Sequence, residues 1–231
     1  AIDMLEKDNH KIMLEILEIL KKIFYENDGL NINTENFKVS TKKSFNADLG
    51  LGFFNKLYNN RKNLEIIMPA LNKDSYNVKL CAKNQWSIVI SNFCSEDIID
   101  NHINSYLEHS ELKKDEALKK IKLSKLIFVS EDKKSLEKKL TAEDSPYLKV
   151  VDIIYKKLKT FNKHQCFGEN LKNSTEALKS ICLFGDPDQV KEKVLKYQTK
   201  HGSLSSIIFV NVPKTNLKEY DKSLELFAKY V

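Results

Sequence analysis

The feature that most constrains the fold is a rhythm of short apolar runs separated by stretches with helical periodicity. Four such runs occupy residues 64–70, 86–90, 123–129 and 205–211. Short, nearly continuous apolar runs are typical of parallel strands that are buried on both faces. Because strands that alternate with helices form right-handed βαβ units, the sequence predicts an α/β fold with about four parallel strands and flanking helices.

The helix that starts near Asp186 has the clearest boundaries. Asp186 can cap it, Pro187 suits its first position and Gln189 completes a capping box, while Gly202 suits its end. Further helices are expected at 10–25, 75–83, 95–109, 132–140, from Pro146 onward, at 174–183 and at 217–231, with an extended segment or hairpin at 30–45 and a loop at 46–62.

Two architectures fit four parallel strands flanked by helices. One is an open doubly wound sheet, and the other is the second half of a (β/α)8 barrel. The sequence contains no G-x-G-x-x-G, G-x-x-x-x-G-K-[ST] or G-x-S-x-G motif. It therefore lacks the phosphate loops of dinucleotide- and nucleotide-binding proteins and the nucleophile elbow of α/β-hydrolases.

Charge and hydropathy exclude two classes of partner. The 231 residues carry a net charge of +6, nearly all of it from lysine, since Arg61 is the only arginine. Nucleic-acid readers rely on arginine for bidentate contacts, and these lysines are interspersed with glutamate along helical stretches, as on a solvated surface. No apolar run approaches the roughly 20 residues that span a bilayer. We expect neither a nucleic-acid nor a membrane partner.

The four cysteines are scattered. Cys81, Cys94, Cys166 and Cys182 form no C-x-x-C pair, so neither a metal site nor a redox motif is expected. Scattered cysteines are typical of buried thiols in a reducing compartment, and together with the lack of a secretory start they indicate a cytoplasmic protein.

Several short motifs occur in an order that is similar to one enzyme family. Residues 185–190 read GDPDQV, residues 223–228 read SLELFA, and Ser145-Pro146-Tyr147 precedes a long helix. The helix at 13–20 and the extended piece to Phe37 precede the first apolar run. In this order the motifs resemble the bacterial luciferase-like flavin-dependent monooxygenases, in which the corresponding helix start has the form G-[ST]-P-[ED]-x-V. The resemblance covers most of the chain.

The resemblance implies the C-terminal part of a (β/α)8 barrel. The first three strands of the family precede the helix with which this chain begins, so those strands have no counterpart here, and we expect the fourth strand to be missing as well. We expect residues 1–231 to form one luciferase-like domain with a helical insertion at 141–183. The start at Ala1 rather than Met indicates either a processed chain or a fragment, and the order of the elements favours a fragment truncated at its N-terminus.

The resemblance also implies a flavin, with FMN as the expected cofactor and a deazaflavin left open. In a barrel the site lies at the carboxyl ends of the strands, and the phosphate contact of the family lies in the loop after 64–70. Asn72, Ser75 and Tyr76 can donate hydrogen bonds there and Lys73 adds positive charge, so these four are the predicted cofactor ligands. The alternative is that Asp74 or Ser75 only caps the following helix.

The activity implied by the resemblance is that of an oxidoreductase in which reduced flavin activates O2 to oxidise a small apolar organic substrate. Asn92 and Phe93 are the predicted substrate-pocket residues, with core packing as the alternative role of Phe93. No catalytic acid or base is predicted. The expected partners are a flavin reductase and either a second copy of the chain or the missing N-terminal part, since unpaired strand edges favour association.

Two other functions stay open. The chain could be a non-catalytic relative that binds flavin or a partner and lacks the front of the barrel. It could also be an open-sheet interaction module with an accidental resemblance. Binding of FMN would separate the non-catalytic relative from the interaction module. An in-frame continuation of about 100 residues upstream of Ala1, a typical length for the missing βα units, would favour the enzyme over the non-catalytic relative.

Overall fold

The computed structural model describes residues 9–25, 31–40, 65–160, 164–210 and 217–231. The chain forms two compact units, Ala1–Leu64 and Glu65–Val231. The loop expected at 46–62 lies outside the described residues. The single domain with an insertion at 141–183 stays a prediction.

The first unit is a helix with a hairpin, as predicted. Thr34 and Ile32 of the hairpin contact the helix: the Thr34 hydroxyl donates a hydrogen bond of 2.8 Å to Glu15, and Ile32 is buried with Ile19. Asn36 also donates to the Glu15 carboxylate, so several polar contacts and one buried apolar pair fix the antiparallel hairpin to the helix. The elements are α1 (Asn9–Tyr25), β1 (Asn31–Asn33) and β2 (Lys38–Ser40).

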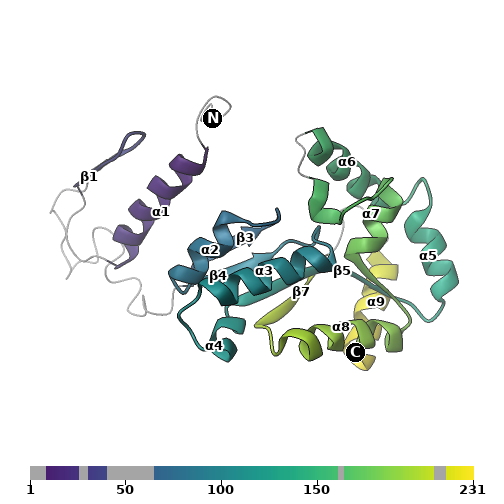
Figure 1. Cartoon of the computed structure of the whole chain (residues 1–231). Coiled ribbons are helices and arrows are strands. Elements are labelled where there is room, and N and C mark those ends of the chain that lie inside the picture. The colour runs from purple at the N-terminus through teal and green to yellow at the C-terminus, as the bar shows by residue number, and fades with distance from the viewer. Residues whose placement is uncertain (1–8, 26–30, 41–64, 161–163, 211–216) are drawn as a thin grey trace, which may run out of the picture. The chain divides into compact units, whose positions relative to one another are not determined.

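The second unit is built on a five-stranded parallel sheet (Figure 1). This finding confirms the predicted fold class, an α/β fold of partial (β/α)8 type. The strands are β3 (Ile67–Ala70), β4 (Ser87–Ile90), β5 (Ile121–Val129), β6 (Cys182–Gly185) and β7 (Ser206–Val210). The helices are α2 (Tyr76–Lys83), α3 (Glu96–His109), α4 (Lys114–Leu118), α5 (Lys133–Thr141), α6 (Pro146–Thr160), the 3-10 helix η2 (His164–Phe167), α7 (Ser174–Ile181), α8 (Pro187–His201) and α9 (Leu217–Tyr230).

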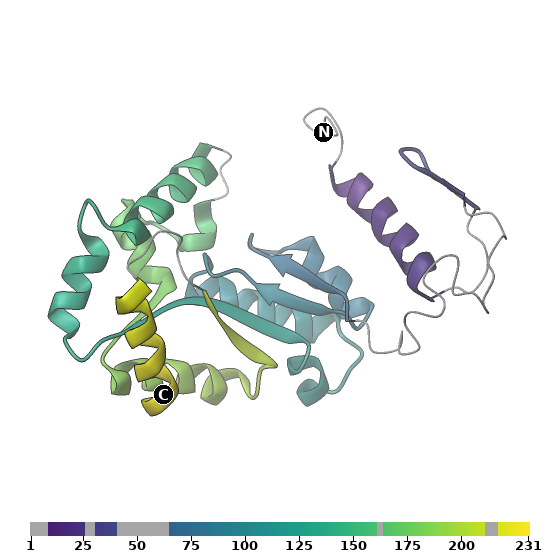
Figure 2. The same ribbon diagram turned by 180° about the vertical axis from the view of Figure 1, so that it is seen from behind.

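Strand β5 is the centre of the sheet. Its Lys122 pairs with both β4 and β7, and its Leu126 pairs with both β6 and β7. Strand β7 therefore runs along one edge of β5, while β4 and β6 follow one another along the other edge. Strand β3 lies outside β4. Figure 2 shows α9 crossing the carboxyl half of β5.

One face of the outer strands is open. Ile67 on β3 is 42% exposed and Ile208 on β7 is 39% exposed, and strand register places both on the same face of the sheet. The prediction that the first strand is buried on both faces is therefore wrong for β3. Helices α2 and α3 cover only the opposite face, on which Met68 and Ala70 are buried. An open face suits a partial barrel better than a doubly wound sheet, in which helices cover both faces.

A second departure concerns residues 174–183. The predicted helix ends at Ile181, and the next four residues form β6. Their backbone pairs with the carboxyl half of β5 while Cys182 and Leu183 are buried, so ladder hydrogen bonds and burial on the sheet outweigh continuation of the helix. The five-residue helix α4 and the 3-10 helix η2 were also not predicted.

Helix α8 begins as predicted. The Asp186 side chain accepts a hydrogen bond from the Gln189 amide at 2.9 Å, and the Gln189 side chain accepts one from the Asp186 amide at 3.4 Å. The helix ends at Gly202, where φ is +99°, a backbone conformation that favours glycine. The main core cluster lies at the carboxyl end of β5, where α5, α6 and α7 pack against Leu126 and Phe128.

Candidate functional site

The loop between β3 and α2, together with the first residue of α2, carries all four predicted cofactor ligands. Asn72, Lys73 and Tyr76 are exposed and Ser75 is half-buried. The loop follows the carboxyl end of β3, which is where ligands bind in folds built from parallel βα units. The structure thus gathers the four residues at one end of the sheet, accessible to a ligand.

Asp74 is the one acidic residue of this loop, and α3 holds it. Its φ is +55°, its amide donates a hydrogen bond of 3.1 Å to the Asn101 side chain, and its carboxylate accepts one of 3.2 Å from the same side chain. The neighbouring Lys73 ammonium lies 3.4 Å from the Glu169 carboxylate. The loop therefore presents a cation whose charge Glu169 partly offsets.

Ser75 occupies the N-cap position of α2, but its hydroxyl makes no capping hydrogen bond. Its backbone carbonyl accepts a hydrogen bond from the Val78 amide at 3.1 Å. The first turn of α2 contains no acidic side chain, and the one carboxylate near this helix N-terminus is that of Asp74, just before the N-cap, which accepts a hydrogen bond from Asn101. A hydroxyl and a helix N-terminus beside Lys73 form an arrangement that favours an anion.

The predicted substrate residues follow the next strand, β4. Asn92 and Phe93 are both half-buried. The ring of Phe93 lies 5.8 Å from the ring of Phe167, so Phe93 packs at the edge of the main core cluster. The thiol of Cys94 donates a hydrogen bond of 3.4 Å to the Leu71 carbonyl, which ties the loop after β4 to the loop after β3.

A buried lysine behind these loops was not predicted. Lys125 of β5 is fully buried, and its ammonium donates a hydrogen bond of 3.1 Å to the Cys94 carbonyl and lies 3.5 Å from the Glu96 carboxylate. Burial lowers the pKa of Lys125, and Glu96 acts in the opposite direction. The Tyr197 hydroxyl donates to the same carboxylate. This network fixes the end of β4 to β5 and α8.

His102 of α3 lies under the β3–α2 loop and is fully buried. Burial lowers its pKa to about 4, while the backbone of Leu71 and the Asp74 carboxylate act in the opposite direction. The imidazole is therefore neutral at pH 7.

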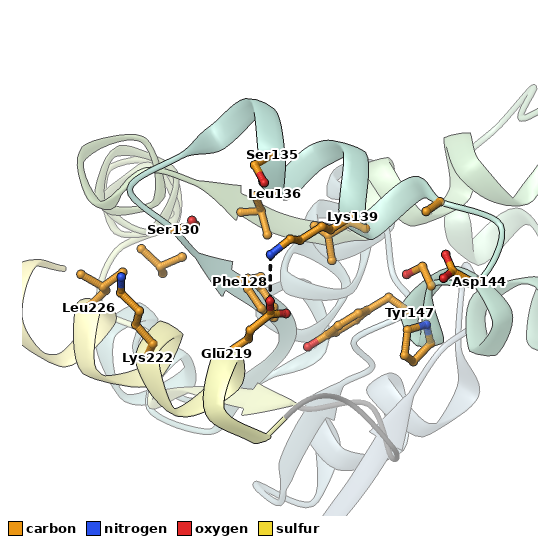
Figure 3. Close-up of a pocket in the computed structure, with 15 residues that line it drawn as sticks. Phe128, Ser130, Ser135, Leu136, Lys139, Asp144, Tyr147, Glu219, Lys222 and Leu226 are labelled. Atoms are coloured by element: carbon orange, nitrogen blue, oxygen red, sulfur yellow. Dashed lines mark hydrogen bonds and ion pairs between the residues drawn. The ribbon is translucent and has the colours of Figure 1, made fainter.

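A cavity of about 520 Å³ lies at the carboxyl end of β5 (Figure 3). Its walls come from the end of β5, from α5 and the turn into α6, and from α9. None of the six predicted site residues lines it. Sequence reasoning missed the cavity because its walls come from segments that are far apart in the chain and carry no motif.

In the described part of the chain, no three His, Cys, Asp or Glu side chains cluster in a way that could hold a metal ion. Among the same residues, no helix combines the length and the apolar character needed to cross a bilayer.

No protein-family model matches the sequence, and no curated protein matches it. Solved structures do match the fold. One is a type II Baeyer-Villiger monooxygenase, the oxygenating constituent of 3,6-diketocamphane monooxygenase from the CAM plasmid of Pseudomonas putida in complex with FMN. It aligns with 97% of this chain at a TM-score of 0.77 and 16% identity. Another is the monooxygenase RslO1 from Streptomyces bottropensis, which aligns with the whole chain at a TM-score of 0.65 and 11% identity.

The alignments cover 63% of the first of these proteins and 62% of the second, so the chain spans less than two thirds of their length. At these identities the likeness shows the fold and not the activity. The chain therefore has the partial (β/α)8 fold that these two monooxygenases contain.

Proposed function

We propose that the chain is part of a reduced-flavin-dependent monooxygenase of the luciferase-like family, which oxidises a small apolar organic substrate with O2. The observation that carries the proposal is the alignment of 97% of the chain with a monooxygenase that holds FMN. The open face of β3 and β7 supports it, because the inward face of a complete barrel is enclosed by further strands. A closed barrel would need those strands beyond the outer edges of β3 and β7. We propose the N-terminal part of the barrel as the partner of these edges, with a second copy of the chain as the alternative.

The residues of the β3–α2 loop fit a flavin phosphate. Lys73 would supply the charge, and Asn72, Ser75 and Tyr76 would donate hydrogen bonds, with the α2 N-terminus beside them. Asp74 is held by Asn101 of α3. Reduced flavin, when bound, supplies the electrons that activate O2, and a flavin reductase would deliver it.

The chain's own residues would form the substrate pocket beside the flavin. Asn92 and Phe93, at the end of the adjacent strand, would border the substrate, and Phe93 with Phe167 would exclude water from that side. The Lys125–Glu96 pair would hold the end of β4 in place beneath them.

The first test is FMN binding to the full chain, followed by quenching of flavin fluorescence. Lys73→Gln is expected to weaken binding about tenfold, because a charge-assisted phosphate contact is lost. Glu169→Gln is expected to strengthen binding about two- to threefold, because Lys73 no longer shares its charge with a carboxylate. Lys156→Gln, in an exposed ion pair on α6, is the control. Equal affinity in all four proteins would contradict the phosphate site. A parallel titration with a deazaflavin cofactor tests the cofactor choice.

The second test is turnover. The chain is assayed alone and together with any coding sequence that continues upstream of Ala1, using FMN, a flavin reductase and 3,6-diketocamphane as a probe substrate. Oxygenated product that depends on O2 supports the enzyme. FMN binding without product under every condition would favour the non-catalytic relative, and a stable monomer that does not bind FMN would favour the interaction module.

We also propose a cytoplasmic location. All four cysteines are buried free thiols, and burial raises the pKa of each to about 12. Such thiols are unreactive and persist in a reducing compartment. Fractionation of the source cells tests the location.

A further inference from the structure

We infer that the cavity at the carboxyl end of β5 is a binding site for a small organic cation, a molecule with an apolar body and one ammonium group. The cavity shares no residue with the loops proposed for flavin and substrate. The inference therefore does not depend on the proposed function.

The inner walls of the cavity are apolar. Phe128, Leu136, Leu140 and Leu226 line it, and each of these residues is at most 8% exposed. The ring of Tyr147 meets that of Phe128 edge to face, with the centroids 5.5 Å apart, so this part of the wall has a defined shape. The volume of about 520 Å³ falls within the roughly 300–1,000 Å³ typical of small-molecule sites. Burial of an apolar body against these walls supplies most of its affinity.

Both lysines at the rim already have a carboxylate partner. The Lys139 ammonium lies 2.8 Å from the Glu219 carboxylate, and this pair joins α5 to α9 (Figure 3). The Lys222 ammonium lies 3.5 Å from the Glu131 carboxylate. An anionic ligand would have to take one of these lysines from its partner, so the rim disfavours an anion.

The remaining charge in the cavity wall is negative. Asp144, in the turn between α5 and α6, lines the cavity and is exposed. Among the described residues, none forms an ion pair or a hydrogen bond with its carboxylate. Figure 3 shows Asp144 beside Tyr147, at the side of the cavity away from Lys222. A cation at this position is attracted by a carboxylate and separates no existing pair.

These two features fit one arrangement of the ligand. Because Asp144 is exposed, an ammonium group beside it keeps its contact with water, and the cost of removing a charge from water is largely avoided. The hydrocarbon part then lies inside, against Phe128 and Leu226. Aliphatic amines carry the required charge at pH 7, since an alkylammonium such as that of lysine has a pKa of about 10.4.

The test uses three probes with the same hydrocarbon cage: 1-adamantanamine, 1-adamantanol and adamantane-1-carboxylate. Each is titrated into the full chain by calorimetry at pH 7 and low ionic strength. The amine is expected to bind about three- to fivefold more tightly than the alcohol, the gain typical of an exposed ion pair, and the carboxylate should bind most weakly. Added salt should reduce the preference for the amine. An amine that does not bind at millimolar concentration, or that binds no more tightly than the alcohol, would overturn the inference.

A pair of matched variants locates the charge. Asp144→Asn is expected to weaken binding of the amine about three- to fivefold and to leave binding of the alcohol unchanged. The control is Glu143→Gln, which removes the neighbouring exposed carboxylate, one that does not line the cavity. Equal weakening of the amine in both variants would show that a general attraction and not Asp144 is responsible, and would overturn the inference.

A third variant locates the apolar body. Ser135 of α5 is half-buried and lines the cavity, and Figure 3 shows it on the side of Leu136 and Lys139. Ser135→Trp is expected to fill part of the space and to abolish binding of all three probes. Thermal unfolding checks that this variant is folded; if it is not, the comparison of Asp144→Asn with Glu143→Gln decides alone, since both positions are exposed. Unchanged binding of the alcohol to folded Ser135→Trp would show that the cage binds elsewhere and would overturn the inference.

Discussion

The buried imidazole of His102 makes stability depend on pH in a way that can be calculated. Burial lowers its pKa from 6.5 to about 4 in the folded chain, and unfolding returns it to 6.5. Between these values the unfolded state binds more protons than the folded state. The free energy of unfolding therefore falls as the pH falls through this window, and the stability is fully present above pH 6.5.

The size of the effect follows from the same two values. At 1.36 kcal/mol per pKa unit, a decrease from 6.5 to about 4 corresponds to a loss of about 3 kcal/mol, nearly complete at pH 4. The side chain is fully buried, so solvent screening reduces this figure little. A loss of this size is a large fraction of the roughly 5–15 kcal/mol that stabilises a typical domain.

The assay is urea unfolding at pH 7, 5.5 and 4, on the wild-type chain and on His102→Leu. Hydrogen-bonded carboxylates such as Glu65 and Asp152 have lowered pKa values and also lose stability in acid, but they do so in both proteins. The difference between the two free energies of unfolding isolates His102, and it should shift by about 3 kcal/mol in favour of the variant between pH 7 and pH 4. A difference that does not change with pH, or an NMR titration that places the His102 pKa near 6.5, would refute the reasoning.

Three further changes test single contacts by urea unfolding. Asp186→Ala should cost about 0.5–2 kcal/mol through loss of the capping box, while Asp188→Ala in the same turn should cost less. Ser223→Ala should cost about 1–3 kcal/mol, because it leaves the buried Val129 amide without the hydroxyl that accepts its hydrogen bond at 2.8 Å. Tyr106→Phe should cost about 1 kcal/mol through loss of its 2.6 Å hydrogen bond to the Trp86 carbonyl. No measurable loss in one of these variants would contradict the contact assigned to it.

Local signals predicted the elements that depend on local physics. The start of α8 needs only Asp186, Pro187 and Gln189, which are adjacent in the chain, and its boundaries were predicted to the residue. Strand β6 was missed because its four residues continue the apolar pattern of α7, where Ala177, Leu178 and Ile181 are buried. What makes residues 182–185 a strand is the free edge of β5 beyond β4, which no local pattern reveals.

In the candidate site, too, the residues that are adjacent in the chain were predicted and those that meet only in the folded structure were not. The loop after β3 was predicted as a site because its polar residues follow an apolar run and because the family resemblance implies a phosphate contact there. The role of Lys125 was not predicted, because this role depends on Glu96 and Tyr197. These two residues are 101 positions apart in the chain and meet only when α3 packs beside α8. The apolar run around Lys125 predicted the strand, but it could not indicate which residues contact the Lys125 ammonium.

The length of β5 connects the sheet to the cavity. In the described part of the chain, strand β7 ends at Val210 opposite Leu126, so no described strand pairs with that edge of the last residues of β5. Helix α9 takes that place, and Ser223 accepts the hydrogen bond of the Val129 amide, which would otherwise be buried without a partner. A helix cannot lie as close to a strand edge as another strand does, because its side chains stand between the two backbones. The space left between α9, α5 and the end of β5 is the cavity, with Lys222 and Leu226 on either side of the anchored serine in its wall. Among the described elements, the cavity thus lies where α9 takes the place of a strand beside the end of β5, and the parallel topology of the sheet places it at the same end as the β3–α2 loop.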